Sequence, residues 1–228
     1  MKNDLKICQY NDLLTDNEEL NELMNEYIVV SCLNIANNAQ FKTDYFDVKD
    51  HIFGNSDYIK MFVIEEGKKI PNIKAFLIAD LINGYNDNTI LHCHGIIVDP
   101  SIQGLGVGRE LINYLIEKYA PDIVTAKTHN PRCFNTLINA NGIIKYYPNE
   151  GMVPNDIYEL VKSNPFISCV DENLIYVNAY PDEKIQQDYR NNLIRNIFAK
   201  VKTNDAQAVV GVINDSKLDL ENKKLVKR

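Results

Sequence analysis

The sequence has no apolar run of membrane-spanning length, and its first residues contain no apolar core of a signal peptide. We therefore expect a cytoplasmic protein with no membrane partner. It also has no dense patch of Lys and Arg, and its net charge is −7. This charge balance argues against nucleic acid and anionic lipid as partners.

Metal and disulfide patterns are missing as well. The five cysteines are odd in number, lie far apart, and show no Cys-x-x-Cys or Cys/His ligand spacing. Neither a disulfide framework nor a metal site is predicted. With 228 residues, 45% of them hydrophobic and 24% charged, the chain is of globular composition and is long enough to bury one sizeable core.

Glycine occurs at only ten positions, but three of these fall in the short segment Gln103-Gly104-Leu105-Gly106-Val107-Gly108. Glycines at alternate positions permit a tight turn and let a polyanion approach the backbone. An amphipathic run over residues 110–119 follows, so the segment begins a helix, where backbone N–H groups favour phosphate. We predict a pyrophosphate-binding turn here.

Two other phosphate loops fit less well. A P-loop requires Lys and Ser or Thr after its last glycine, but Arg109 and Glu110 stand here. This disfavours nucleotide phosphate transfer. A dinucleotide fingerprint has Gly-x-Gly-x-x-Gly after the first strand of the fold, whereas this segment follows several expected strands. A tight strand-to-helix turn without a ligand is the remaining alternative.

Hydrophobic periodicity and turn residues predict alternating elements along the chain. The expected strands are 5–10, 59–65, 73–82, 89–98, 122–127, 143–147, 174–180 and 206–213. The expected helices are one that starts at the capping box Thr15-Asp-Asn-Glu18, then 110–119, 131–141, 155–163 and 182–202. Residues 34–55 are ambiguous between a second helix and a loop, and 217–228 are expected to fray.

The pattern Gln103-x-x-Gly106-x-Gly108, preceded by Val98-x-Pro100, resembles the acyl-CoA-binding motif of the GNAT superfamily of N-acyltransferases. The resemblance implies a mixed α/β fold with a mostly antiparallel sheet, two splayed parallel strands between which pantetheine enters, and flanking helices. Residues 1–150 would form the acyltransferase core. Residues 151–228 are expected to be an extension of the same globular unit that completes the sheet or shapes the acceptor pocket.

The resemblance also implies which residues bind acetyl-CoA. Backbone amides before the glycines would pair with pantetheine or the thioester, and those of the glycine segment would surround the pyrophosphate. Asn130 matches the Asn that bonds the pantetheine arm, although a helix N-cap is an equally simple role. The complete expected set is Ile97, Val98, Gln103, Gly104, Leu105, Gly106, Val107, Gly108, Arg109, Asn130 and Cys133.

Acyl transfer to an amine requires a base, and His92 and His94 are the candidates. They lie two residues apart on an expected strand and therefore on one face of it. The string Leu91-His92-Cys93-His94 resembles the paired histidines of the arylalkylamine N-acetyltransferases, which implies proton relay through water. The alternative is that one or both are hydrogen-bonded packing residues of the sheet.

The general acid of many family members is missing. Leu137 and Ile138 stand where a Tyr is usual, a few residues after Asn130. Water is one substitute, and the side chains that could serve instead are Cys133, Thr136, Tyr146 and Tyr147. His129 is expected to be exposed.

The sequence therefore predicts an enzyme that transfers an acetyl group from acetyl-CoA to a primary amine of a small molecule or a protein, without a metal. A non-catalytic acyl-CoA-binding or regulatory module is the alternative, which the missing Tyr favours and the two histidines oppose. The sequence leaves open the acceptor, the acyl length and the oligomeric state, a homodimer included.

Overall fold

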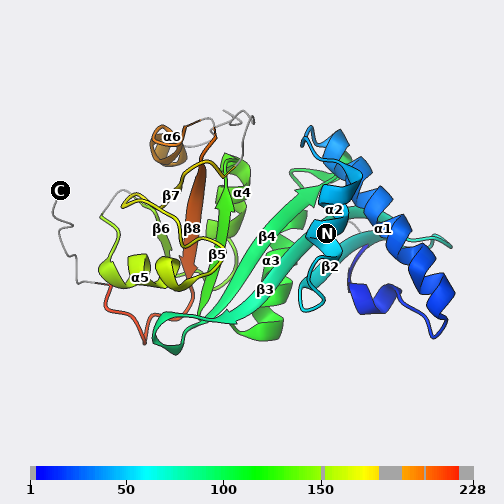
Figure 1. Ribbon diagram of the computed structural model, residues 1–228, viewed down its shortest axis with the longest axis horizontal. Helices are drawn as coiled ribbons and strands as arrows, with labels where there is room; N and C mark the ends of the chain where they lie inside the picture. The colour runs from blue at the N-terminus through cyan, green and yellow to red at the C-terminus, as the bar shows by residue number, and fades with distance from the viewer. Residues whose placement is uncertain (1–3, 150–151, 180–191, 203, 221–228) are drawn as a thin grey trace. The chain divides into compact units, whose positions relative to one another are not determined.

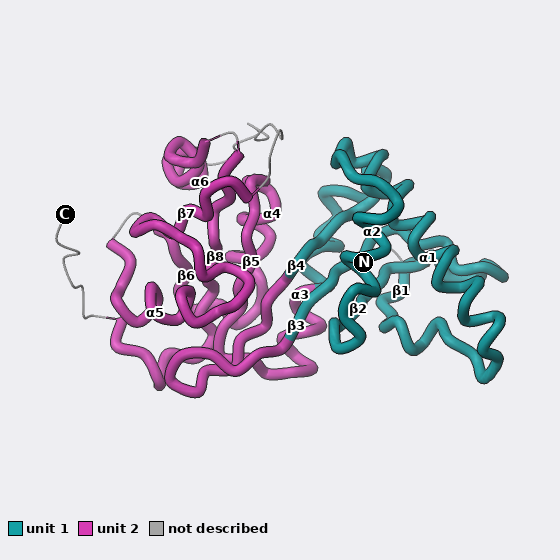
Figure 2. Tube along the Cα trace, viewed as in Figure 1, with its two compact units in different colours: residues 1–80, 94–111 teal, residues 81–93, 112–228 magenta. Residues whose placement is uncertain are grey.

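A computed structural model describes residues 4–149, 152–179, 192–202 and 204–220. The chain forms two compact units, one of Met1–Asp80 and His94–Leu111, the other of Leu81–Cys93 and Ile112–Arg228. Figure 2 shows that the long strands β3 (Asn72–Asn83) and β4 (Thr89–Val98) pass from one unit into the other. Within the described ranges, no helix is long and apolar enough to cross a membrane.

The first unit contains an antiparallel meander (Figure 1). Strand β1 (Leu5–Gln9) pairs with β2 (Ile59–Glu65), which pairs with β3. Two longer helices belong to this unit, α1 (Glu18–Asn38) and α2 (Tyr45–Phe53), together with the short 3-10 helices η1 (Tyr10–Leu13) and η3 (Pro100–Ile102). The ambiguous stretch 34–55 thus contains the end of one helix and the whole of another.

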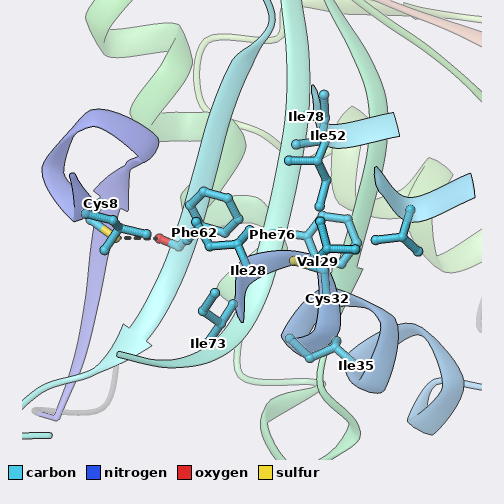
Figure 3. Close-up of a cluster of buried hydrophobic side chains, with 12 residues drawn as sticks. Cys8, Ile28, Val29, Cys32, Ile35, Ile52, Phe62, Ile73, Phe76 and Ile78 are labelled. Carbon is cyan, nitrogen blue, oxygen red and sulfur yellow. Dashed lines mark hydrogen bonds between the residues drawn. The ribbon is translucent and has the colours of Figure 1, made fainter. Parts of the chain in front are cut away.

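The first unit has its own hydrophobic core, drawn in Figure 3. Fully buried side chains of α1 and β2, such as Ile28 and Phe62, pack there with Ile52 of α2. Alternation along β2 and β3 places Phe62, Phe76 and Ile78 of this core on one face of the meander, because successive residues of a strand point to opposite faces. The two helices cover that face.

The expected capping box of α1 is wrong in detail. The helix begins at Glu18, and its N-cap is Asn17, whose side chain accepts a hydrogen bond from the Leu20 amide at 3.1 Å. The backbone amide of Thr15 instead donates a hydrogen bond to Asn21 Oδ1 at 2.8 Å. Asn is as good an N-cap as Thr, so the sequence pattern alone did not separate the two.

The second unit contains the parallel strand pair that the resemblance implied. Strand β4 pairs in parallel with β5 (Ile123–Thr128), in register from Ile90 opposite Ile123 to Cys93 opposite Ala126. Antiparallel strands follow, with β8 (Ala206–Val212) pairing to β5, to β6 (Lys145–Tyr147) and to β7 (Ile175–Tyr176). The hydrogen-bonded strand order is β1-β2-β3-β4-β5-β8-β6, which confirms a mixed, mostly antiparallel sheet.

Helices accompany these strands (Figure 1). They are α3 (Val107–Tyr119), α4 (Pro131–Ile138), α5 (Asn155–Ser163) and α6 (Asn192–Phe198), with the 3-10 turn η2 (Tyr85–Asp87) between β3 and β4. Residues 182–191 of the expected helix 182–202 lie outside the described residues, and within the described part of the expected strand 174–180 only β7 is a strand.

The C-terminal segment supplies a central strand. All seven residues of β8 are buried, which fits its apolar sequence Ala-Gln-Ala-Val-Val-Gly-Val. Gly211 is required by packing, because a Cβ there would lie 2.5 Å from Cδ1 of Ile143. Two strands that follow residue 150, β7 and β8, are therefore part of the sheet of the second unit.

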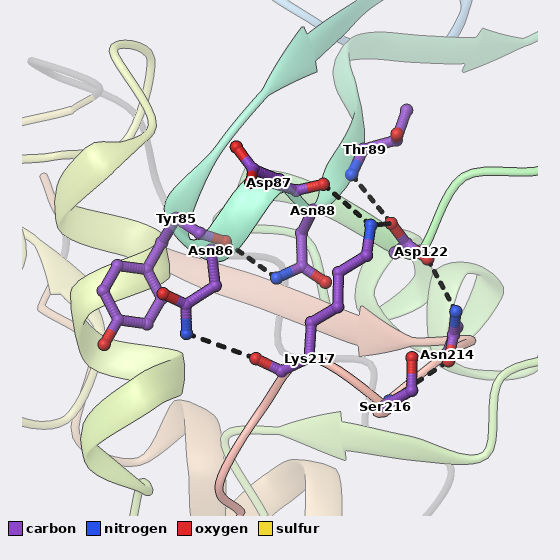
Figure 4. Close-up of polar contacts among 9 residues, drawn as sticks. All are labelled: Tyr85, Asn86, Asp87, Asn88, Thr89, Asp122, Asn214, Ser216 and Lys217. Carbon is purple, nitrogen blue, oxygen red and sulfur yellow. Dashed lines mark hydrogen bonds and ion pairs between the residues drawn. The ribbon is translucent and has the colours of Figure 1, made fainter.

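Asp122 anchors the end of the described chain within the second unit (Figure 4). Its carboxylate accepts hydrogen bonds from the Thr89 amide at 2.9 Å, Asn214 Nδ2 at 2.8 Å and Lys217 Nζ at 2.9 Å. Lys217 also donates to the Asp87 carbonyl at 2.8 Å. The expectation that the chain frays from Lys217 onward is therefore wrong at that residue, and 221–228 lie outside the described residues.

Candidate functional site

The predicted phosphate turn is built on local hydrogen bonds at the end of β4. Asp99 caps the short helix η3 by accepting a hydrogen bond from the Ser101 amide at 2.9 Å. Ile102, in the same short helix, is buried. Gln103 folds back, with Nε2 donating to the Val98 carbonyl at 2.9 Å. These contacts bring the chain out of the strand and into the glycine segment.

The glycines adopt the conformation that the motif requires. Gly104 and Gly106 have φ of +80° and +81°, a left-handed region that side chains disfavour. A Cβ at Gly104 would meet no atom within 4 Å, so this position needs glycine for its backbone angle and not for space. Alternating backbone conformations of this kind turn successive N–H groups toward one concave side, which suits an anion.

Helix α3 begins at Val107, three residues earlier than expected, so the glycine segment forms its N-terminus. The Glu110 amide donates to the Gly106 carbonyl at 3.0 Å, the first turn of the helix. Val107 is buried and fixes the helix, whereas Gln103, Leu105 and Arg109 are exposed. Nη2 of Arg109 lies 3.8 Å from the place of a Cβ at Gly106, so the guanidinium adds positive charge beside the turn.

His92 lies in a closed polar cluster of the second unit. Its ring is 1% exposed and stacks on Phe166, with ring centroids 5.0 Å apart. His92 Nδ1 lies 2.9 Å from Thr125 Oγ1, and Asn164 Nδ2 donates to that oxygen at 3.1 Å. Nδ2 is also 3.5 Å from His92 Nδ1, which favours an unprotonated Nδ1 that accepts from the Thr125 hydroxyl.

His94 lies in different surroundings, within the first unit. Its half-buried ring is tilted against Tyr58, with centroids 4.4 Å apart, and faces His51 edge-on at 6.5 Å. Burial raises the pKa of Tyr58, and the negative charges of Asp80 and Asp50 raise it further. The phenol therefore keeps its proton, and the electrostatic environment of this cluster is negative.

His51 and Tyr58 were not identified from the sequence. His51 lies in the last turn of α2, inside the ambiguous stretch, and Tyr58 precedes β2. No motif spacing links either of them to His94, which lies more than thirty positions away in the sequence. Only the packing of α2 and the meander in the first unit brings the three rings together.

Asn130 and Cys133 lie where β5 leads into α4 in the second unit. The Asn130 side chain accepts from the Arg132 amide at 2.9 Å, which confirms the N-cap role. Its own amide donates to Thr128 Oγ1 at 2.9 Å. Burial raises the pKa of the Cys133 thiol to about 11, although a hydrogen bond with Thr128 opposes the shift.

The candidate substitutes for the missing acid are poorly placed for that role. Tyr147 is buried in the hydrophobic cluster of the second unit, and burial raises its pKa. A thiol with a pKa of about 11, that of Cys133, is a weaker acid than an ordinary thiol of about 8.5, so it does not favour protonation of a leaving thiolate. Thr136 bonds the Arg132 carbonyl at 2.8 Å, as helical threonines do.

His129 also differs from expectation, because it is buried and not exposed. Burial lowers the pKa of its imidazole. Across the described part of the chain, no group of three or more His, Cys, Asp or Glu side chains is arranged to hold a metal ion.

Comparison with known proteins agrees with this geometry. Residues 20–132 match the model of the Acetyltransferase (GNAT) family, a range that includes β2, β3, β4, the glycine turn and the start of α4. The chain belongs to the GNAT acetyltransferase family. Members of this family use acyl-CoA and act on amine acceptors, so the protein is an acetyltransferase by family.

Solved structures of GNAT acetyltransferases resemble this chain in fold. The ribosomal-protein-S18-alanine N-acetyltransferase of Escherichia coli has a TM-score of 0.50 and 14% identity, covering 97% of this chain and 99% of that one. The NatC complex bound to Gag peptide and CoA has a TM-score of 0.49 and 11% sequence identity. The match covers 92% of this chain and 98% of that one. None of the curated proteins has a sequence that matches this chain. At such identities the likeness concerns the fold and not the acceptor.

Proposed function

We propose that this GNAT protein transfers an acetyl group from acetyl-CoA to a primary amine of a small molecule or a protein. The observation that carries the proposal is the exposed turn with left-handed Gly104 and Gly106 at the N-terminus of α3. This backbone suits the pyrophosphate of CoA, since its N–H groups and the helix dipole favour an anion. The guanidinium of Arg109 adds charge at the same place.

The other proposed cofactor contacts come from the backbone before the turn and from the start of α4. Ile97 and Val98 end β4, and their amides are the proposed partners of the pantetheine arm or the thioester oxygen. Asn130 and Cys133 complete the proposed set. The Asn130 side-chain oxygen already caps α4, so its Nδ2 is the group proposed to donate to pantetheine.

His94 is the proposed base, and the proposed contribution of His92 is to hold β4 in place through its buried contacts with Thr125 and Phe166. The ammonium of the acceptor gives one proton to the His94 imidazole, and the free amine then attacks the thioester carbonyl. The C–N bond forms and the C–S bond breaks, and the second amine proton leaves with the CoA thiol. Because a thiolate is a good leaving group, a water molecule that relays this second proton suffices, and no dedicated acid is needed. His94 is half-buried, whereas the cluster around His92 is closed.

The test measures CoA release from acetyl-CoA by chromatography, so that the five cysteines of the protein do not interfere. The panel contains an amino acid, a polyamine, an aminoglycoside and a peptide with a free amino terminus. The proposal expects release that depends on one of these amines, and a matching acetylated product. Gly106→Val should weaken CoA binding at least tenfold, because a β-branched residue does not adopt a φ of +81°.

A non-catalytic acyl-CoA-binding module remains the second candidate, favoured by the lack of a general acid in the described site. It predicts that calorimetry detects CoA binding while no amine causes release. Absence of CoA binding would refute both candidates.

A further inference from the structure

We propose that His51 is the second group on the proton path of this enzyme, taking the proton from His94 and releasing it to solvent. The inference rests on the proposed acyl transfer and deepens it. It assigns a role to a side chain of α2 that no sequence motif marks. The observations that carry it all lie within the first unit.

The two imidazole rings lie edge to face. The ring centroids of His51 and His94 are 6.5 Å apart with an interplanar angle of 88°. His94 is half-buried on β4, whereas His51 is exposed at the end of α2. A proton taken up at His94 therefore has a titratable neighbouring ring, His51, that is exposed to bulk water.

The backbone of β4 is shaped to admit His51. A Cβ at Gly95 would lie 2.6 Å from His51 Nε2, closer than two such atoms approach. The φ of Gly95 is not in the left-handed region, so glycine is required there only for the space that the imidazole fills. Because Gly95 has no side chain, the His51 nitrogen lies against the strand, one residue after His94.

The charges around His51 and His94 favour a protonated imidazole. Tyr58 lies against the His94 ring, and the carboxylates of Asp50 and Asp80 act on its phenol. Lys60 brings a cation to the backbone of Tyr58, where its ammonium donates to the Tyr58 carbonyl at 3.3 Å. Because the Tyr58 ring contacts the His94 ring, the carboxylates that act on Tyr58 also favour positive charge on His94.

The steps balance. The acceptor ammonium gives a proton to His94, His94 passes it to His51, directly or through one water, and His51 gives it to bulk water. Both imidazoles end neutral, and the net reaction releases one proton to solvent for each acetyl group transferred. His92 is not a suitable alternative, because it is 1% exposed and bonded to Thr125.

The kinetic test is His51→Gln, which keeps a polar side chain but cannot carry a proton. We expect kcat to fall about tenfold, with KM for acetyl-CoA unchanged. A high concentration of imidazole buffer should restore the lost rate in this variant and leave the wild-type rate unchanged. The matched control is Lys49→Gln, on the same helix, where an exposed ion pair with Glu26 is lost without effect on turnover. Unchanged kcat, or a loss that imidazole does not restore, would overturn the relay.

A second measurement does not depend on turnover. NMR titration of the histidine rings in the wild type and in His51→Gln reports whether the two imidazoles interact. Removal of a neighbouring imidazolium removes a repulsion, so the His94 midpoint should shift to higher pH. Identical His94 titrations would refute the pair even if the enzyme is active. If no amine is acetylated by the wild type, the proposed function fails, and the titration still decides whether the pair exists.

Discussion

His92 and His94 are two residues apart on β4, yet their surroundings differ in almost every respect. His92 is buried among Thr125, Asn164 and Phe166 of the second unit. His94 is half-buried against Tyr58 and His51 of the first unit. The boundary between the units falls between Cys93 and His94. Strand alternation places the two side chains on one face, but the tertiary partners decide which of them reaches solvent.

Two histidines on one face of a strand therefore need not act together in a reaction. A hydroxyl and an amide fix one tautomer of His92, as in a buried polar network that specifies a core. The rings of Tyr58 and His51 contact His94, and the carboxylates of Asp80 and Asp50 act on Tyr58. The predictions below test each side of this division.

The largest effect is expected from breaking the cluster around His92. Asn164→Ala removes the donor to Thr125 Oγ1 and the acceptor that holds the Phe166 amide at 2.9 Å, and leaves buried polar groups without partners. We expect the free energy of unfolding to fall by about 3 kcal/mol, measured by urea denaturation. The control Asn139→Ala, at an exposed site, should change it by less than about 0.5 kcal/mol. Equal effects in the two variants would contradict a structural role for the cluster.

A smaller loss is expected at Asp122, a second polar anchor of the same unit that is less enclosed. Burial alone would raise its pKa, but hydrogen bonds from Lys217, Thr89 and Asn214 outweigh this and hold the pKa below its usual value. A carboxyl with a lowered folded pKa stabilises the fold above the unfolded value of about 3.9, and the stabilisation is lost as the pH falls through the folded pKa.

Asp122→Asn should therefore lower the free energy of unfolding by about 2 kcal/mol at neutral pH. The gap between the variant and the wild type should narrow as the pH falls below about 4, since protonation of Asp122 removes the same charge. Denaturation curves over a pH series measure this. A gap that is independent of pH would show that the ion pair does not contribute.

The smallest effect is expected from Gly95→Ala, which tests the surroundings of His94. The added methyl group forces the His51 ring away from β4, while the strand backbone accepts alanine. Turnover should fall several-fold with little loss of stability, because the clashing atom is the end of a movable side chain. In the double variant with His51→Gln, we expect no further loss, since both changes break one path. Additive losses in kcat would indicate that Gly95 acts independently of His51.

Local patterns were sufficient for much of the fold. The strands 59–65 and 89–98 and the helix 155–163 match β2, β4 and α5 residue for residue, because alternation and end signals are strong there. The glycine turn was predicted from three closely spaced glycines, because a left-handed backbone favours glycine. The early start of α3 at Val107 was missed because the same glycines read as loop.

Contacts between distant segments were not predictable in this way. The partners of His92 come from β5 and from the end of α5, and those of His94 come from α2 and the residue before β2. Their sequence separations carry no periodic signal. The buried state of His129 and the ion pair of Lys217 depend in the same manner on tertiary packing.

The measurement that tests the account most directly compares His94→Gln with His92→Gln, using kcat for amine acetylation and the dissociation constant of CoA for each. We expect His94→Gln to lower kcat about 100-fold with unchanged CoA affinity, as loss of a general base does. His92→Gln should mainly lower stability, with a smaller loss of kcat. Full turnover in His94→Gln, or a larger kcat loss in a stably folded His92→Gln, would contradict it.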